Sequence, residues 1–206
     1  MISWLRFIHR PIYESRQRAL LRLIVPVLRE SDRVLDVGCG YGSLGLALME
    51  DEACPRDVIV HGLERFPRDE ALIEIDGYDG GRMPYEDDAF DVVILADVLH
   101  HEKNPAFLLQ ECARVSRRVV IIKDHKTDGI LAQQRISFID WAANAPYGVK
   151  CLYRYNTYQE WLTSHERYGL SVQQELTSLN VYPLFVNLIF GRRLHYFVVL
   201  APAGSD

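Results

Sequence analysis

Two patterns of apolar residues alternate along the chain. Short, mostly apolar runs at 33–37, 58–63, 91–96 and 119–122 have the length and the polar flanks of strands that are buried on both faces. Between the first two runs, apolar residues from Leu44 to Met49 follow helical spacing. Strands that alternate with helices predict an α/β fold built on a parallel sheet.

Prolines and the closing strands refine this prediction. We expect a first helix to begin at Pro11 and to bend or end at Pro26, because proline suits the first helical position and disrupts an interior turn. A short third strand is expected at 71–75. Two closing strands, at 171–177 and 195–200, have no full helix between them, which predicts antiparallel pairing at one edge of the sheet.

Length and composition place the chain among ordinary globular proteins. Its 206 residues suit one domain, and a hydrophobic fraction of 49% excludes intrinsic disorder. The four cysteines lack the spacing of a zinc site, and no apolar stretch approaches the ~18 residues of a membrane-spanning helix. The N-terminus lacks the apolar core of a signal peptide, so we expect a cytoplasmic protein with reduced thiols.

Charge is distributed unevenly. The net charge is −5, but residues 1–30 carry six Arg and two Glu, a local charge of +4, so that the rest of the chain carries −9. An acidic body argues against a nucleic-acid partner, because binding to phosphates needs a basic field. The basic segment predicts either a helix that lies on the acidic body or a weak contact with a membrane surface.

A glycine loop follows the first strand, in the segment Asp36-Val-Gly38-Cys39-Gly40-Tyr-Gly42. Glycines before a helix allow a ligand to approach the backbone closely. The spacing differs from the Gly-x-Gly-x-x-Gly of dinucleotide folds, and Asp36 would repel a pyrophosphate. A ligand that carries an ammonium and a sulfonium group tolerates that carboxylate.

Further motifs follow in order. Glu64 ends the second strand, 22 residues after Gly42. Asp79-Gly80 follows the third strand, Met83-Pro-Tyr85 comes next, and Asp88-Ala-Phe-Asp-Val-Val93 leads into the fourth strand.

Over residues 31–125 this series resembles the class I S-adenosylmethionine-dependent methyltransferases, in the small-molecule branch related to ubiquinone and sterol methyltransferases. The resemblance implies a Rossmann-like, doubly wound, mostly parallel seven-stranded sheet with an antiparallel edge strand and helices on both faces. It implies that Glu64 receives the ribose hydroxyls, that Asp79 and Gly80 meet the adenine, and that Asp97 begins the wall around the methionine moiety. The cofactor set it implies is Asp36, Gly38, Cys39, Gly40, Gly42, Glu64, Asp79, Gly80 and Asp97, with S-adenosylhomocysteine as the product.

Five candidate catalytic residues follow two neighbouring strands. Asp97, His100 and His101 come after the fourth strand, and Asp124 and His125 come after the fifth. Because ligands bind at the carboxyl ends of such strands, we expect these side chains to converge. One of the histidines could be a general base, or the residues could shape a pocket and cap helices. Catechol-type methyltransferases hold a metal at these strand ends, but their Asp-Asn is Asp-His here, so no divalent metal is expected.

The acceptor leaves less trace in the sequence. The fourth strand lacks the Asn/Asp-Pro-Pro-Tyr/Phe motif of nucleic-acid amine methyltransferases, so a small acceptor is expected. The long apolar segment 181–190 is predicted to form an acceptor pocket or lid with the first helix. We therefore divide the single domain 1–206 into a helical cap (1–30), a cofactor half (31–125) and an acceptor half (126–206).

These observations predict an enzyme that methylates O, N or C of a small, apolar or aromatic acceptor. A protein that binds the cofactor without turnover remains an alternative. A nicotinamide-dependent oxidoreductase is disfavoured by the glycine spacing and by Asp36. The oligomeric state has no signature in the sequence.

Overall fold

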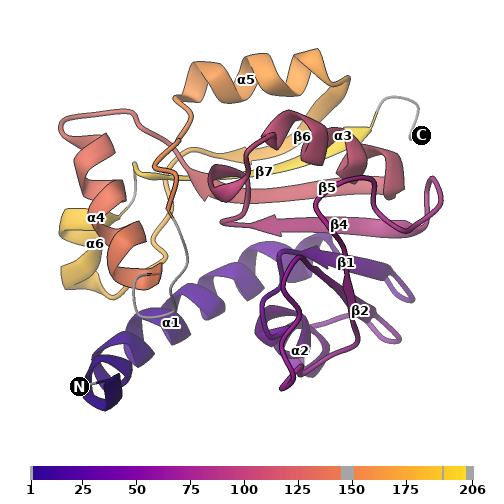
Figure 1. Cartoon of the computed structure of the whole chain (residues 1–206), viewed down its shortest axis with the longest axis horizontal. Coiled ribbons are helices and arrows are strands. Elements are labelled where there is room, and N and C mark those ends of the chain that lie inside the picture. The colour runs from indigo at the N-terminus through magenta and orange to yellow at the C-terminus, as the bar shows by residue number, and fades with distance from the viewer. Residues whose placement is uncertain (1, 145–150, 192, 203–206) are drawn as a thin grey trace.

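The computed structural model describes residues 2–144, 151–191 and 193–202. Within them, seven strands form one sheet in the order β3-β2-β1-β4-β5-β7-β6 (Figure 1). The strands are β1 (Arg33–Val37), β2 (Ile59–Glu64), β3 (Ile75–Gly77), β4 (Phe90–Ala96), β5 (Ser116–His125), β6 (Leu170–Leu176) and β7 (His195–Pro202).

Strand directions agree with the predicted α/β class. β1 pairs in parallel with both β2 and β4, and the parallel pairing continues to β3 on one side and to β5 on the other. β7 runs antiparallel to β5 and to the outermost strand β6, which confirms the antiparallel pairing expected at one edge. The chain order reverses between β1 and β4, and such a reversal opens a crevice at the carboxyl ends of the strands.

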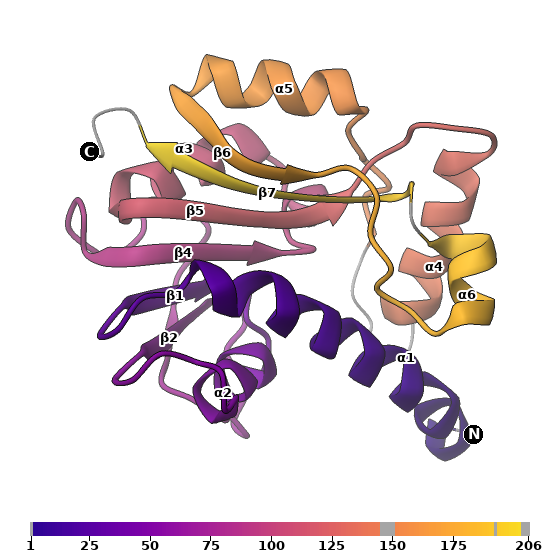
Figure 2. The same cartoon turned by 180° about the vertical axis from the view of Figure 1, so that it is seen from behind.

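Helices cover both faces of the sheet (Figures 1 and 2). Leu20 of α1 and Leu48 of α2 pack with one set of strand side chains, and Leu109 of α3 and Trp161 of α5 pack with the alternate set. Helices α4 and α6 lie beyond the carboxyl ends of β4 and β5. The helices are α1 (Ile2–Ile24), α2 (Ser43–Glu50), α3 (Pro105–Val115), α4 (Ala132–Asn144), α5 (Tyr158–Arg167) and α6 (Leu184–Phe190), with 3₁₀ turns η1 (Val25–Val27) and η2 (Leu99–His101).

Two predicted boundaries are wrong. The first helix begins at Ile2, so Pro11 lies inside it; Pro11 is exposed, and the residues on both sides continue the helix. The helix ends at Ile24, just before the turn that contains Pro26, as predicted. The third strand is Ile75–Gly77, because residues before it are drawn toward the glycine loop, where the Leu72 N–H donates to the Tyr41 carbonyl.

No described helix combines the length and the apolar character needed to cross a membrane. The segment 181–190, predicted to be a pocket wall or lid, contains the short helix α6. That helix packs against α4 at the end of the molecule.

Candidate functional site

The glycine loop joins β1 to α2 with a backbone that ordinary residues rarely adopt. Gly38 and Gly40 have φ angles of +69° and +62°. A Cβ on Gly38 would lie 2.8 Å from a methyl carbon of Val98, so this position also lacks room for a side chain. A Cβ on Gly40 would meet nothing within 4 Å. The loop therefore presents its backbone to open space, as close binding of a ligand requires.

Glu64 holds the loop from the end of β2. Its Oε2 accepts a hydrogen bond from the Gly40 N–H at 2.9 Å, and its Oε1 accepts one from the Arg65 N–H at 2.8 Å. The Gly38 N–H donates to the Leu63 carbonyl at 2.7 Å. These bonds bring the ends of β1 and β2 together and place a carboxylate beside the loop.

Asp36 is the least satisfied group of this region. It is 2% exposed, and its Oδ2 has no hydrogen-bond partner among the described residues. Burial raises its pKa to about 7, although Arg16 acts in the opposite direction and Glu64 adds to the rise. Burial and the same carboxylates raise the pKa of Cys39 to about 12, so that this thiol stays protonated. A buried carboxylate without a partner suits a cationic ligand.

The loop after β3 folds against the loop after β2. Asp79 is exposed, and its Oδ1 accepts a hydrogen bond from the Gly81 N–H at 2.8 Å. Gly80 has a φ of +87°, and a Cβ there would lie 2.7 Å from the guanidinium carbon of Arg65. Asp79-Gly80 and Glu64 therefore flank one side of the crevice, and Asp36 and the glycine loop lie next to them.

Asp97 is at the centre of a buried ion cluster after β4. Its Oδ2 accepts from Arg16 Nε at 2.9 Å and Nη2 at 2.7 Å, and its Oδ1 accepts from Lys123 Nζ at 2.5 Å. Lys123 is 1% exposed. Burial alone would raise the pKa of Asp97, but the charges of Lys123 and Arg16 outweigh it and hold that pKa well below its usual value. Asp97 is therefore negatively charged at neutral pH. Its backbone has a φ of +64°.

His100 and Asp124 form a second ion pair. His100 Nδ1 lies 2.6 Å from Asp124 Oδ1, and the same oxygen accepts from the His125 N–H at 2.7 Å. Burial lowers the pKa of His100, but the Asp124 carboxylate outweighs burial and raises it to about 10. His100 is thus protonated at neutral pH and cannot accept a proton.

The other two histidines are neutral at the same pH. Burial and the charge of Lys123 lower the pKa of His125 to about 4. Its Nδ1 lies 3.4 Å from the Leu194 carbonyl, and its Nε2 lies 3.7 Å from Asp97 Oδ1. Burial and the neighbouring His100 lower the pKa of His101. The structure thus brings together the five side chains that the sequence placed after the fourth and fifth strands.

Four members of this network were not foreseen. Arg16 belongs to the basic first helix, and Lys123 lies within β5. Asp140 comes from α4; its Oδ2 accepts from Tyr155 at 2.6 Å, and its Oδ1 lies 3.6 Å from Nε2 of both His100 and His101. Of these four, Lys123 is the residue that the sequence could have indicated, because a cation inside an apolar run needs a buried partner.

The donors of a catechol-type metal site are already engaged. Asp97 holds two cations, and Asp124 holds His100. Among the described residues, the donor group close enough to share an ion is His100, His101 and Asp140, whose ligand atoms lie within 4.8 Å of one another. In the structure these atoms belong to the hydrogen-bonded network around Tyr155.

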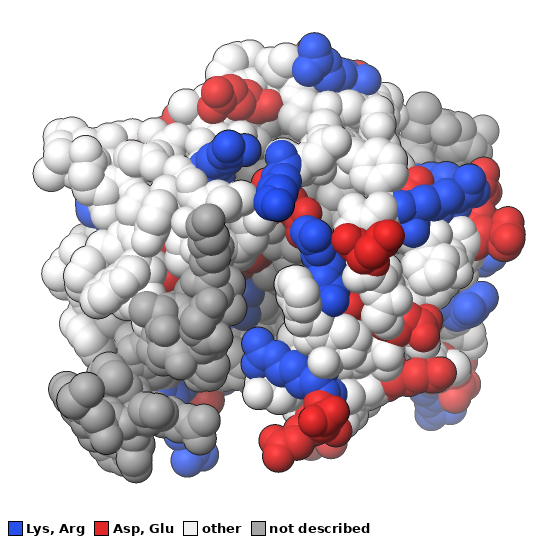
Figure 3. Space-filling view, viewed as in Figure 1, with Lys and Arg blue, Asp and Glu red and all other residues white. Residues whose placement is uncertain are grey.

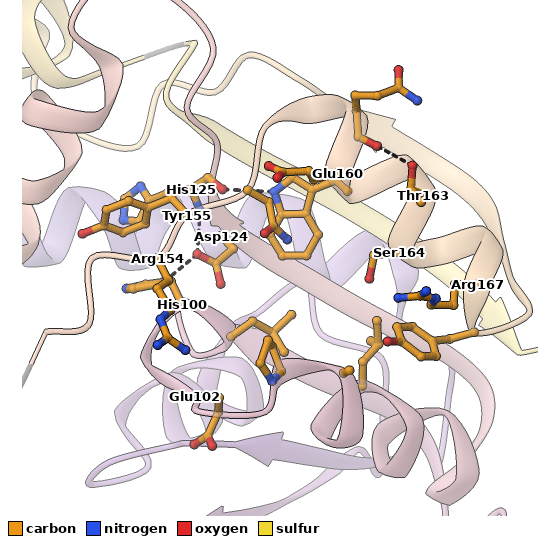
Figure 4. Close-up of a pocket in the computed structure, with 18 residues that line it drawn as sticks. His100, Glu102, Asp124, His125, Arg154, Tyr155, Glu160, Thr163, Ser164 and Arg167 are labelled. Carbon is orange, nitrogen blue, oxygen red and sulfur yellow. Dashed lines mark hydrogen bonds and ion pairs between the residues drawn. The ribbon is translucent and has the colours of Figure 1, made fainter.

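A cavity of about 400 Å³ opens between α3 and α5 (Figure 4). Leu109, Trp161 and Tyr168 give it apolar and aromatic walls, and charged residues such as Arg167 lie around it. His100, Asp124, His125 and Tyr155 occupy one end of it. The segment 181–190 does not contribute to its lining, so the predicted role of that segment as a pocket wall is not seen in this cavity.

Comparison with known proteins gives a family match. The model of a family described as "Methyltransferase domain" matches residues 5–175. The 27-O-demethylrifamycin SV methyltransferase of Amycolatopsis mediterranei (strain S699) is 32% identical over 103 residues, which are 44% of this chain and 36% of that protein. The match thus spans about a third of the length of that curated relative.

Solved structures show the same fold. A SAM-dependent methyltransferase from Aquifex aeolicus superimposes with a TM-score of 0.62 at 16% identity, over 98% of both chains. A Haloferax volcanii protein, solved in complex with the Trm112 methyltransferase activator, gives a TM-score of 0.64 at 14% identity, over 98% of this chain and 93% of that one.

The ion cluster around Asp97 generates a stability prediction. Arg16→Ala should lower the free energy of unfolding by about 2–3 kcal/mol, because it removes one partner of a largely buried charge. Arg10→Ala is the matched control on the same helix: Arg10 pairs with Glu14 at the surface, and its loss should cost less than about 0.5 kcal/mol. Urea unfolding at neutral pH measures both, and equal losses would contradict the central role of the cluster.

Proposed function

The chain belongs to the methyltransferase domain family, of the class I S-adenosylmethionine-dependent type, and we propose that it moves a methyl group to a small, apolar or aromatic acceptor at O, N or C. The observation that carries the proposal is the buried, unpartnered carboxylate of Asp36 beside the glycine loop. It suits a ligand that brings positive charge to the end of β1.

The residues at this edge of the sheet fit S-adenosylmethionine. Asp36 would attract the ammonium group, and the backbone from Gly38 to Gly42 leaves room for close approach. Glu64 offers two carboxylate oxygens for a ribose diol, while Asp79 and Gly80 would meet the adenine. Asp97 would close the site on the side of the methionine moiety. When bound, the cofactor supplies an electrophilic methyl group on its sulfonium.

The same carboxylates disfavour a nicotinamide dinucleotide. Asp36 and Glu64 flank the loop where a pyrophosphate would have to bind. The two carboxylates would repel the pyrophosphate and so weaken its binding. One described cation, Arg68, contacts the loop, with its guanidinium 4.2 Å from the centre of the Tyr41 ring. Arg16, whose charge lowers the pKa of Asp36, is bound to Asp97.

We propose that the acceptor enters the cavity between α3 and α5. Its aromatic walls suit a flat, apolar molecule, and its volume is that of a small-molecule site. The neutral ring of His125 lies at one end of this cavity, with Nε2 as the atom that can take a proton. A base is needed only if the acceptor arrives protonated, and the name of the Amycolatopsis relative favours an oxygen acceptor.

Under this proposal, the remaining residues position the base. The protonated His100 and Asp124 fix the neighbouring backbone, since the Asp124 carboxylate binds both His100 Nδ1 and the His125 N–H. Tyr155 and Asp140 hold the other side of His100. We expect no divalent metal in the reaction. We also expect no nucleic-acid partner, because the body of the protein is acidic.

Calorimetry tests cofactor identity directly. S-adenosylhomocysteine should bind, and NAD should not. Gly40→Ala should weaken S-adenosylhomocysteine at least tenfold, since it adds a side chain on the face where the ligand would lie. Gly129→Ala is the matched control: Gly129 also has a positive φ and open surroundings, but lies in the loop after β5. Tight binding of NAD, with no binding of S-adenosylhomocysteine, would favour an oxidoreductase. Binding of S-adenosylhomocysteine, with no transfer of a radiolabelled methyl group to any molecule in a metabolite extract, would favour a binding protein.

Asp36 predicts a pH dependence. Because its pKa is near 7, the carboxylate becomes charged between about pH 6 and pH 8, and affinity for S-adenosylhomocysteine should rise about tenfold over that range. Asp36→Asn should abolish the rise and weaken binding at high pH. The raised pKa also means that the stability of the free protein falls as pH rises from about 4 to about 7, so the Asn variant should be more stable than wild type at pH 8. An Asp36→Asn variant that binds S-adenosylhomocysteine more weakly and is also less stable than wild type at pH 8 would contradict this assignment.

His125 predicts a selective loss of turnover. His125→Asn should lower kcat by about 10²-fold or more while the affinity for S-adenosylhomocysteine is unchanged. His165→Asn is the control: burial also lowers the pKa of His165 to about 4, but its Nε2 binds Tyr196 and it does not line the cavity. Wild-type kcat should be the same with and without a chelator; a loss of activity in chelator would show that the reaction needs a metal.

A further inference from the structure

A cluster of exposed apolar side chains covers the end of the molecule formed by α4 and α6. Each of its members is more than half exposed. We call this surface the α4–α6 face and define it by Ile130, Phe138, Trp141, Leu184, Phe185 and Leu188.

The cluster is continuous across the two helices. The rings of Phe138 and Phe190 stack at 5.7 Å, and Trp141 lies 6.1 Å from Phe138. Arg135 donates from Nε to the Ile189 carbonyl at 2.6 Å, which joins α6 to the first turn of α4. In Figure 3 the corresponding end of the molecule, on the left, carries far fewer charged side chains than the right half.

Some other exposed apolar residues lie on different elements. Ile59 and Phe66, for example, belong to β2 and to the loop that follows it. Single exposed apolar residues are normal on soluble proteins, whereas a contiguous apolar face marks an interaction surface.

The charges of this surface have one sign. Segments 129–142 and 180–193 contain one carboxylate, Asp140, which is 4% exposed and belongs to the histidine network. Of the described residues, the same segments contain the cations Arg135 and Arg193. The surface is therefore apolar and basic on a protein whose net charge is −5.

We propose that the α4–α6 face docks the protein on an anionic lipid membrane. Aromatic and aliphatic side chains would enter the boundary between headgroups and acyl chains, and the arginines would meet lipid phosphates. A symmetric dimer through this face is disfavoured, because a two-fold axis would bring its arginines against one another. The contact does not depend on methyl transfer, so it stands or falls separately from the proposed activity.

This site differs from the basic first helix that the sequence suggested. Arg16 of that helix is bound to Asp97, and Arg10 is paired with Glu14. The charges of these two arginines are compensated within the protein, whereas Arg18 and Arg22 of the same helix are exposed. On the α4–α6 face, Arg135 and Arg193 accompany exposed apolar side chains, which supply the area that a stable contact needs.

Vesicle sedimentation tests the proposal with the full chain. The protein should sediment with vesicles of phosphatidylcholine that contain about one quarter phosphatidylglycerol, and at least several-fold less with pure phosphatidylcholine. The double variant Phe185→Ser/Leu188→Ser should lower the partition coefficient about tenfold or more, because two apolar side chains no longer enter the bilayer. Arg193→Gln should weaken binding a few-fold, on anionic vesicles only.

Phe66→Ser is the matched control. Phe66 is 78% exposed and Phe185 is 70% exposed, but Phe66 lies outside the α4–α6 face. Near-ultraviolet circular dichroism of each variant checks that its fold is intact. Equal losses in the control and the double variant, or no sedimentation of the wild type, would overturn the proposal. Light scattering that shows a dimer of the wild type and a monomer of the double variant would also overturn the proposal, since the face would then bind a second copy.

Discussion

The ion cluster of Asp97 with Lys123 and Arg16 is the interaction on which the site depends. It joins α1, the end of β4 and the middle of the sheet at β5 through hydrogen bonds of 2.5–2.9 Å. A buried lysine in a central strand would be severely destabilising without a carboxylate beside it. The cluster therefore constrains where α1 crosses the sheet and how the chain leaves β4.

The same charges set the protonation of their neighbours. Lys123 adds to the effect of burial on His125 and keeps that ring neutral, whereas Asp124 keeps His100 charged. Asp36 is buried with little compensation, and its pKa rises, while Asp97 is buried among cations, and its pKa falls. Groups of one chemical type are thus divided into different protonation states by their surroundings, as the proposed role of His125 as a base requires.

The two ends of the crevice differ in how they are built. On the proposed cofactor side, the backbone of the glycine loop is held by two hydrogen bonds, from the Gly38 N–H to the Leu63 carbonyl and from the Gly40 N–H to the Glu64 carboxylate. On the proposed acceptor side, side chains from η2, β5, α4 and the segment before α5 converge around His100 and Tyr155. The apolar α4–α6 face adjoins this second side through α4, since Asp140 points into the network and Phe138 lies on the exposed surface.

The sequence by itself determined the parts that depend on local contacts. The strand, glycine loop and helix from Arg33 to Glu50 and the buried strand β4 follow from periodicity and glycine spacing. The convergence of the residues after β4 and β5 followed from the parallel order of the strands. Only the tertiary structure decided the partners of those residues. Arg16 and Asp97 are 81 positions apart in the chain, and Asp140 comes from a helix whose pattern resembles a solvated surface. Periodicity shows which side of an element is buried, but the pairing of buried charges depends on which elements meet, and that is decided by packing.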